Sequence, residues 1–282
     1  MILIADSGAS KTDWRLIDNG EVKGQMQTLG INPYHQKPEN IKAEIMEALM
    51  PQVKDHIDQL FFYGAGCASE ENRDMLANIF SEAFPSSFVT IHHDMLGAAR
   101  ALCGHEAGIA CILGTGANSC FYDGHHIADG VPSTGFILGD EGSGAWLGKQ
   151  LLAGFIRNEL DKEIHERLKK RFDLNRESIL EQVYKMPSPA RYMAGFSKFI
   201  FQNIKNPTLY RLVYNGFEQF FEKNVEHYSQ YKELPIHFTG SVAFYYSNIL
   251  RQVANDRGLT VRNIVESPIA GLTLYHQNSI IQ

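Results

Sequence analysis

The sequence has no excess of positive charge, few cysteines and no Cys-x-x-Cys pair. Its 282 residues carry 26 lysines and arginines against 32 aspartates and glutamates, a formal net charge of −6. No long Lys/Arg run occurs, so we expect no nucleic-acid partner. The four cysteines form no Cys-x-x-Cys pair, which argues against a zinc ribbon, a redox motif or a disulfide framework and is typical of a reducing cytoplasm.

The chain also lacks a run of apolar residues long enough to cross a membrane. Its first residues, MILIADSG, show neither a basic leader nor an extended apolar stretch, so no signal peptide is expected. No Gly/Ser-rich or Pro-rich linker divides it. With 44% hydrophobic and 21% charged residues, the composition is that of a globular protein with a substantial core. We therefore expect a cytoplasmic protein without a membrane partner.

Short apolar runs alternate with amphipathic segments along the first third of the chain. Strands are expected at 2–5, 12–17, 21–29, 59–63 and 88–92, and helices at 38–53, 70–84 and 95–102. Asn19-Gly20 is a strong hairpin signal because both residues tolerate positive φ. The alternation predicts an α/β layer structure.

The pattern restarts at Ile109. IACILGTGANSCFYDGHHIADG has the same order of apolar run, small polar loop, strand, turn and strand as LIADSGASKTDWRLIDNGEVKG. Identity between the two is poor, so this is a repeat of architecture rather than of sequence. A mostly helical stretch is expected at about 144–231, then a strand at 235–239, a helix at 244–255, a short strand and a final helix at 268–277. We place the domains at 1–105, completed by the C-terminal helix 268–282, and at 106–267.

The opening loop, DSGASKTDW, has the composition of an anion-binding turn. A P-loop is excluded, because GxxxxGK[ST] needs a glycine where Ser10 stands and because DWRLID reads as a strand. A phosphate-binding hairpin remains: Gly8 opens the turn, Ser10 and Thr12 offer hydroxyls, and Lys11 neutralises charge. Asp6, at the end of the strand, can hold hydrated magnesium. The alternative is a tight hairpin with a polar tip.

Two later loops have related chemistry. ILGTGANS contains Gly114, Thr115 and Gly116 between two expected strands. Two such hairpins at the start of two similar halves would face each other across a cleft and grip a nucleoside triphosphate. In FTGSVA, Gly240 and Ser241 stand between a strand and a helix, where a glycine permits close approach of a base or ribose.

The ordered set DSGASKTDW, GAG, ILGTGANS, LGDEGSGAWLG, FTGSVA and SPIAGL resembles the actin-like sugar-kinase superfamily. Within it, the chain looks like the N-acetylglucosamine kinase and dehydratase-activator branch, over nearly its whole length. The resemblance implies two ribonuclease H-like domains with an interdomain cleft that closes over ATP and Mg²⁺. It also implies phosphate transfer to a sugar hydroxyl, and it is compatible with a homodimer.

Asp94 is the best candidate for the catalytic base, because it stands between an expected strand and an expected helix and the kinase pattern has its catalytic aspartate there. Its other reading is a helix N-cap. Asp140 and Glu141 in LGDEGSGAW can accept sugar hydroxyls or bind hydrated magnesium, or simply complement a helix N-terminus. By resemblance, Asp140 touches the sugar or the metal and Glu141 orients the loop, although the sequence does not separate these roles.

Further sugar contacts follow from the same resemblance. Asn32 in LGINPYH matches a sugar-contacting asparagine of the N-acetylglucosamine kinases, and its other reading is a turn residue before Pro33. Thr115 and Asn118 are candidates for contact with either phosphate or sugar.

The leading functional hypothesis is an ATP-dependent kinase that phosphorylates an amino sugar, N-acetylglucosamine at its 6-hydroxyl being the first candidate. N-acetylmannosamine, glucosamine and N-acetylmuramic acid stay open. The alternative is an ATPase that activates a partner enzyme, as the dehydratase activators do. Those proteins hold an iron–sulfur cluster through cysteines at a glycine-rich helix start, and GDEGSGAW has none. A sugar-sensing regulator would begin with a helix-turn-helix, whereas this chain begins with the hairpin.

Overall fold

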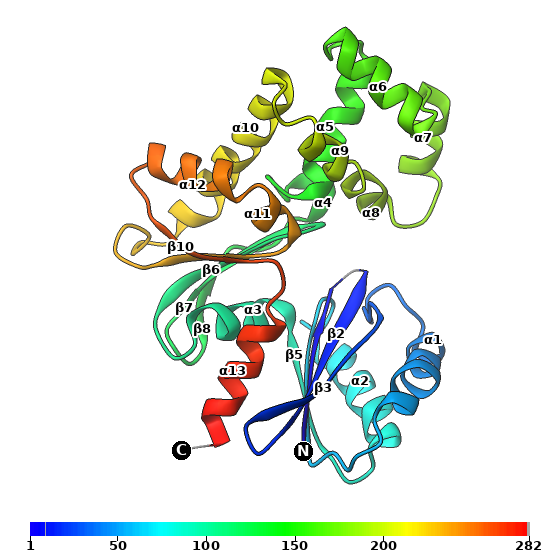
Figure 1. Cartoon of the computed structure of the whole chain (residues 1–282), viewed down its shortest axis with the longest axis vertical. Helices are drawn as coiled ribbons and strands as arrows, with labels where there is room; N and C mark the ends of the chain where they lie inside the picture. The colour runs from blue at the N-terminus through cyan, green and yellow to red at the C-terminus, as the bar shows by residue number, and fades with distance from the viewer. Residues whose placement is uncertain (9, 281–282) are drawn as a thin grey trace. The chain divides into compact units, whose positions relative to one another are not determined.

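The computed structural model describes residues 1–8 and 10–280. The chain divides into two compact units, each containing a mixed five-stranded sheet (Figure 1). The first unit comprises Met1–Glu106, Asp123–Ile127 and Ser267–Gln282, and the second comprises Ala107–Tyr122 and Ala128–Glu266. Among the described residues, no helix has the length and apolar character needed to span a membrane.

The first sheet has the strand order β3-β2-β1-β4-β5. Its strands are β1 (Ile2–Ser7), β2 (Lys11–Asp18), β3 (Glu21–Leu29), β4 (Gln59–Gly64) and β5 (Phe88–His93). β1, β2 and β3 form an antiparallel meander, whereas β4 and β5 run parallel to β1. The turn from β2 to β3 is made by Asn19 and Gly20, both at positive φ, as predicted. The carboxyl ends of β1, β4 and β5 therefore share one edge of this sheet.

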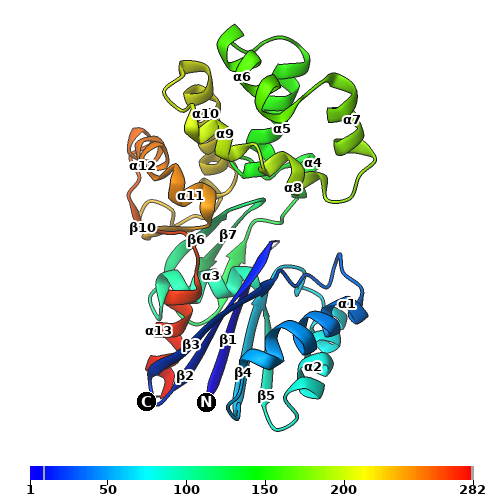
Figure 2. The same cartoon turned by 45° about the vertical axis from the view of Figure 1, so that its right-hand side comes forward.

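Side chains alternate between the two faces of this sheet. Leu3 and Ala5 of β1 pack toward α1 (Pro38–Ala43) and α2 (Glu70–Ala83), whereas Ile4 packs with Ile269 and Leu272 of α13 (Ile269–Ile280). Figure 2 shows α1 and α2 on one side of the sheet and α13 on the other, where it packs against α3 (Asp94–Cys103). The expected helix at 38–53 is one helical run whose middle turn, Glu44–Leu49, is π-helical.

The second sheet repeats the arrangement of the first. Its order, β10-β9-β6-β7-β8, is that of the first sheet when β6 takes the place of β1. The strands are β6 (Gly108–Leu113), β7 (Ala117–Tyr122), β8 (Ile127–Gly130), β9 (Ile236–Thr239) and β10 (Val261–Val265). β7 is antiparallel to β6, and β9 and β10 continue the sheet in parallel. The restart predicted at Ile109 is thus a repeat of ribonuclease H-like topology.

The rest of the second unit is helical and packs on this sheet around a large aromatic and aliphatic core. The helices are α4 (Gly135–Leu138), α5 (Gly144–Ile156), α6 (Lys162–Phe172), α7 (Arg176–Tyr184), α8 (Pro189–Ala194), α9 (Ser197–Gln202), α10 (Pro207–Lys223), α11 (Ser241–Tyr245) and α12 (Ser247–Asp256). The helix expected at 244–255 is therefore two helices, and the first begins three residues earlier than predicted. It starts directly after Gly240, whose carbonyl accepts the N–H of Phe244.

Candidate active site

The opening hairpin closes between Gly8 and Lys11. β1 and β2 pair Ser7 with Thr12, and the Gly8 N–H donates to the Lys11 carbonyl at 3.0 Å. Residue 9 lies outside the described residues. Ser10 and Lys11 are exposed at the tip, so their side chains are available to an anion. The Gly8 N–H closes the hairpin, so it is not a free donor for phosphate. Gly8 is exposed and has no side chain, so it leaves space for a ligand at the tip.

Thr12 takes a different role from the one expected. Its side chain is fully buried, and its hydroxyl donates to the Leu29 carbonyl at 3.0 Å and lies 2.8 Å from the Ser7 hydroxyl. Ser7 in turn donates to the carbonyl of Ile31. These bonds tie the hairpin to the end of β3. We therefore leave Thr12 out of the phosphate-binding set proposed below, because its hydroxyl does not reach solvent.

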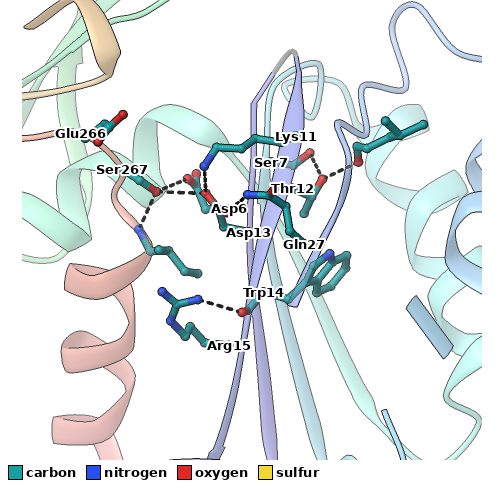
Figure 3. A network of polar contacts seen from close by, with 12 residues as sticks. Asp6, Ser7, Lys11, Thr12, Asp13, Trp14, Arg15, Gln27, Glu266 and Ser267 are labelled. Carbon is teal, nitrogen blue, oxygen red and sulfur yellow. Dashed lines mark hydrogen bonds and ion pairs between the residues drawn. The ribbon is translucent and has the colours of Figure 1, made fainter. Parts of the chain in front are cut away.

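Two carboxylates face each other beside this tip. Asp6, the penultimate residue of β1, pairs directly with Asp13 of β2. The hydroxyl of Ser267 lies 3.3 Å from Asp6 Oδ2 and 3.4 Å from Asp13 Oδ2, as Figure 3 shows. Lys11 Nζ lies 2.8 Å from Asp13 Oδ2, and Gln27 donates to Asp13 Oδ1 at 2.7 Å. One lysine, one amide and one hydroxyl thus surround the pair.

The surroundings separate the proton affinities of these two acids. Burial, reinforced by the negative charge of Asp13, raises the pKa of Asp6 to about 7 against the opposing hydrogen bond from Ser267. Burial also acts on Asp13, but hydrogen bonds from Lys11 and Gln27 hold the pKa of that carboxyl below its usual range. Like charges directly opposite one another on neighbouring strands repel, so the pair favours a bound cation.

The Asp6–Asp13 pair fits the usual protein contribution to a magnesium site, which is one or two carboxylates completed by waters and substrate phosphates. Within the described part of the chain, no group of three or more His, Cys, Asp or Glu side chains is placed to hold a metal ion. Sequence reasoning missed Asp13 and Ser267. The signal for Asp13 was present, because a hairpin that pairs Ser7 with Thr12 places Asp13 opposite Asp6.

Asp94 is the first residue of α3, directly after β5. The N-cap is His93, whose Nδ1 accepts the N–H of Leu96 at 3.3 Å, so Asp94 is not the cap. Asp94 Oδ1 accepts the N–H of Met95 at 2.9 Å. Burial raises the pKa of Asp94, opposed by His93 and by the Met95 bond, and a raised pKa suits a proton acceptor. Its charge also raises the pKa of Asp6, the penultimate residue of β1 at the same edge of the sheet.

Asn32 is held in the loop after β3. Its Oδ1 accepts the N–H of Tyr34 at 3.0 Å, and its own N–H donates to Gln36 Oε1 at 2.7 Å. A Cβ added at Gly66 would lie 2.3 Å from Asn32 Oδ1. The GAG motif after β4 therefore leaves room for Asn32, which makes a turn and lies close to the carboxyl end of the parallel strands.

In the second unit, the Gly-Thr-Gly loop rests on the start of α5. The N–H of Gly114 donates to the Gly116 carbonyl at 3.0 Å, which closes a three-residue tip. The carbonyls of Gly114 and Thr115 accept the N–H groups of Gly144 and Ala145 at 2.8 and 3.0 Å. Two of the free donors at the helix N-terminus are thus satisfied by the loop, which fixes its backbone.

Asp140 and Glu141 have separate surroundings. Asp140 Oδ1 accepts the N–H of Ala117 at 3.3 Å, and burial raises the pKa of this carboxyl. A Cβ at Gly116 would lie 3.0 Å from Asp140 Oδ2, so the glycine leaves space for the carboxylate. Glu141 is buried and pairs with Lys223 at 2.6 Å. Asp140 belongs to the second unit and Asp6 to the first.

Gly240 also has a structural reason to be glycine. Its φ is +112°, and an added Cβ would lie 2.3 Å from the Leu113 carbonyl. The close backbone approach that Gly240 permits is therefore to strand β6 of the same unit.

Two further candidate residues lie near these loops. Ser241 is exposed at the first position of α11. Asn118, in β7, accepts the N–H of Ser119 on its Oδ1 at 2.9 Å.

No protein-family model and no curated protein sequence matches the chain. Among solved structures, a protein from Porphyromonas gingivalis is 42% identical, with a TM-score of 0.95 over 99% of this chain and 100% of its own. The chain belongs to the N-acetylglucosamine kinase-like family of actin-like sugar kinases. The α/β fold of this sugar-kinase family member, with two five-stranded sheets, is the fold class that the ordered motifs indicated.

Two more distant structures share the fold. One, from Chromobacterium violaceum, is 17% identical, with a TM-score of 0.78 over 97% of this chain and 98% of its own. This structure and the Porphyromonas structure are both named "putative N-acetylglucosamine kinase". A Listeria monocytogenes structure named for an N-acetylmannosamine kinase is 13% identical, with a TM-score of 0.52 over 100% of this chain and 99% of its own. At these identities the likeness is one of fold.

Proposed function

We propose that this sugar-kinase family member transfers the γ-phosphoryl group of ATP to an amino sugar, with the 6-hydroxyl of N-acetylglucosamine as the first candidate acceptor. The observation that carries the proposal lies in the first unit. Asp6 is the penultimate residue of β1 and Asp94 directly follows β5, so both lie at the edge where these parallel strands end, near a hairpin that exposes Lys11. The 42% identity with the Porphyromonas gingivalis protein of that name supports the same substrate class.

The proposed roles follow from these surroundings. Ser10 and Lys11 bind the phosphates of ATP at the exposed tip, with Gly8 leaving room for them. Asp94 accepts the proton of the sugar hydroxyl while that oxygen bonds to the γ-phosphorus and the bond to ADP breaks. Asp6, with Asp13, is proposed to hold Mg²⁺, which when bound with ATP neutralises charge on the phosphates.

In the second unit, Thr115 and Asn118 are proposed contacts to phosphate or sugar, and Gly114 and Gly116 shape that loop. Asp140 is proposed to accept sugar hydroxyls, with contact to hydrated magnesium as its other role. Gly240 and Ser241 are proposed to lie near the nucleoside. In the first unit, Asn32 is proposed to contact the sugar.

A partner-activating ATPase is the second candidate, and the cysteines disfavour it. Such an activator would offer thiols to a cluster shared with a second copy of the chain. All four cysteines here are buried: Cys67, Cys103, Cys111 and Cys120.

The proposal is tested by ADP release across N-acetylglucosamine, N-acetylmannosamine, glucosamine and N-acetylmuramic acid, with a reaction lacking sugar as the blank. We expect release that depends on one amino sugar. Asp94→Asn should lower kcat by about 10²- to 10⁴-fold, because the base is lost, while calorimetry shows ATP still bound. ADP release that is equal with and without every sugar would instead support the activator.

A further inference from the structure

Helix α10 holds the loop Gly139–Gly142 at two places. Gly142 has a φ of +74°, and a Cβ added there would lie 3.0 Å from the Gly216 carbonyl, so two backbones meet closely. Seven residues further along α10, Lys223 donates to Glu141 Oε1 at 2.6 Å. Lys223 stands in the last turn of the helix, and 82 positions separate it from Glu141 in the sequence. Figure 1 shows α10 beside α5, the helix that follows this loop.

The Glu141–Lys223 pair has unequal members. The Glu141 side chain is 11% exposed, whereas the Lys223 side chain is 54% exposed. A buried carboxylate without a partner is costly, while an exposed ammonium loses little when its partner is removed. Lys223 therefore determines whether the Glu141 carboxylate is stable in its place within the loop, where its Oε2 would lie 3.5 Å from a Cβ added at Gly139.

Asp140 directly precedes the two residues that α10 holds, Glu141 and Gly142. Its φ is +56°, in the left-handed region that aspartate adopts only at a cost. Such a conformation persists where the surroundings over-determine it. Three contacts do so here: the Ala117 N–H on Oδ1, the Ser143 N–H on the Asp140 carbonyl at 3.0 Å, and the neighbouring Glu141 fixed to Lys223.

We infer that Lys223 is a positioning residue of the sugar site: through Glu141 it holds Asp140 beside the Gly-Thr-Gly loop. This inference rests on the proposed function, in which Asp140 accepts sugar hydroxyls. Loss of the Lys223 charge has two separable effects. It leaves a buried charge without a partner, which lowers stability, and it releases the loop, which weakens sugar binding.

Four variants separate these effects: Lys223→Met, the double variant Glu141→Gln/Lys223→Met, Lys223→Arg, and Lys205→Met as a control at an exposed lysine just before α10. Lys223→Met should lower Tm by at least about 3 °C and raise the sugar KM about 10- to 100-fold, with the KM for ATP unchanged. In the double variant Tm recovers, because the buried charge is gone, while the sugar KM stays raised. In Lys223→Arg, which keeps the charge, Tm and the sugar KM should match those of the wild type. The control Lys205→Met should change neither Tm nor the sugar KM.

Recovery of the sugar KM together with Tm in the double variant would overturn the inference, since Lys223 would then serve stability alone. Hydrogen exchange gives a readout that needs no turnover. Peptides covering Ala117 and Ser143 should exchange faster in Lys223→Met and in the double variant, and unchanged exchange there also overturns it. A wild-type protein that turns over no amino sugar would contradict the proposed function, while the exchange experiment still decides the role of Lys223.

Discussion

Asp94, Thr12 and Ser267 show how far the roles of single residues could be predicted from the sequence. Asp94 was predicted at the junction of strand and helix, and it lies there because β5 ends at His93. Thr12 belongs to the same motif as Ser10 and Lys11, yet strand alternation turns its side chain into the core. Ser267 was out of reach, because its contact with Asp6 joins positions 261 residues apart.

Thr12→Val tests the structural role of that hydroxyl. The variant loses the bonds to Ser7 and to the Leu29 carbonyl, so the free energy of unfolding should fall by about 1–3 kcal/mol. The affinity for ATP should change little, in contrast to Lys11→Met at the exposed tip. Denaturant unfolding and calorimetric ATP titration measure the two. A tenfold loss of ATP affinity with unchanged stability would return Thr12 to the phosphate site.

His276 gives the first unit a predicted acid sensitivity. Its Nε2 lies 2.9 Å from the Tyr63 hydroxyl and its ring stacks on Phe61. Burial, aided by the charge of Arg100, lowers its pKa from 6.5 to about 3. Below pH 6.5 His276 binds a proton in the unfolded chain but stays neutral in the folded chain. The contribution of His276 to the free energy of unfolding is therefore fully present above pH 6.5 and is lost as the pH falls toward 3.

The expected slope from His276 is at most about 1.4 kcal/mol per pH unit. His92, whose pKa burial lowers to about 4, adds in the same direction. Urea unfolding between pH 7 and 4 measures the slope. His276→Gln should flatten it and the exposed His125→Gln should not, whereas equal slopes in all three proteins would remove His276 as the cause.

Element boundaries followed the sequence where local chemistry decides them. β3 spans the expected residues 21–29, because Asn19-Gly20 sets the register of its hairpin. The break between α11 and α12 has no local signal. It falls at Tyr246, which is buried and donates its hydroxyl to the Ser197 carbonyl at 2.7 Å. That contact comes from another helix, so no single segment predicts it.

Gly240→Ala tests the junction of β9 and α11. The added Cβ would meet the Leu113 carbonyl at 2.3 Å, in addition to the strain of a positive φ. We expect a loss of about 3 kcal/mol in the free energy of unfolding. Gly258→Ala is the matched control, since its φ is +72° but nothing lies within 4 Å, and it should cost only about 1 kcal/mol. Equal losses in the two variants would show that strain alone matters.

At the scale of the whole molecule, the two sheets have the same strand order although their sequences differ. The repeat of architecture was predictable, because the hairpin pattern of the first half recurs at Ile109. The way in which the nine helices α4 to α12 pack on one another could not be predicted from the sequence. Their apolar faces are all compatible with a core, and sequence periodicity does not say which faces meet.

The most direct test of the proposed activity is identification of the phosphorylated product. Phosphorus NMR of a reaction with ATP, Mg²⁺ and N-acetylglucosamine should show a sugar phosphomonoester growing in step with ADP, and the same signal should grow at least about 10²-fold more slowly with Asp94→Asn. If no amino sugar is phosphorylated, and ADP appears with inorganic phosphate while the sugar stays unchanged, the proposed kinase function is contradicted.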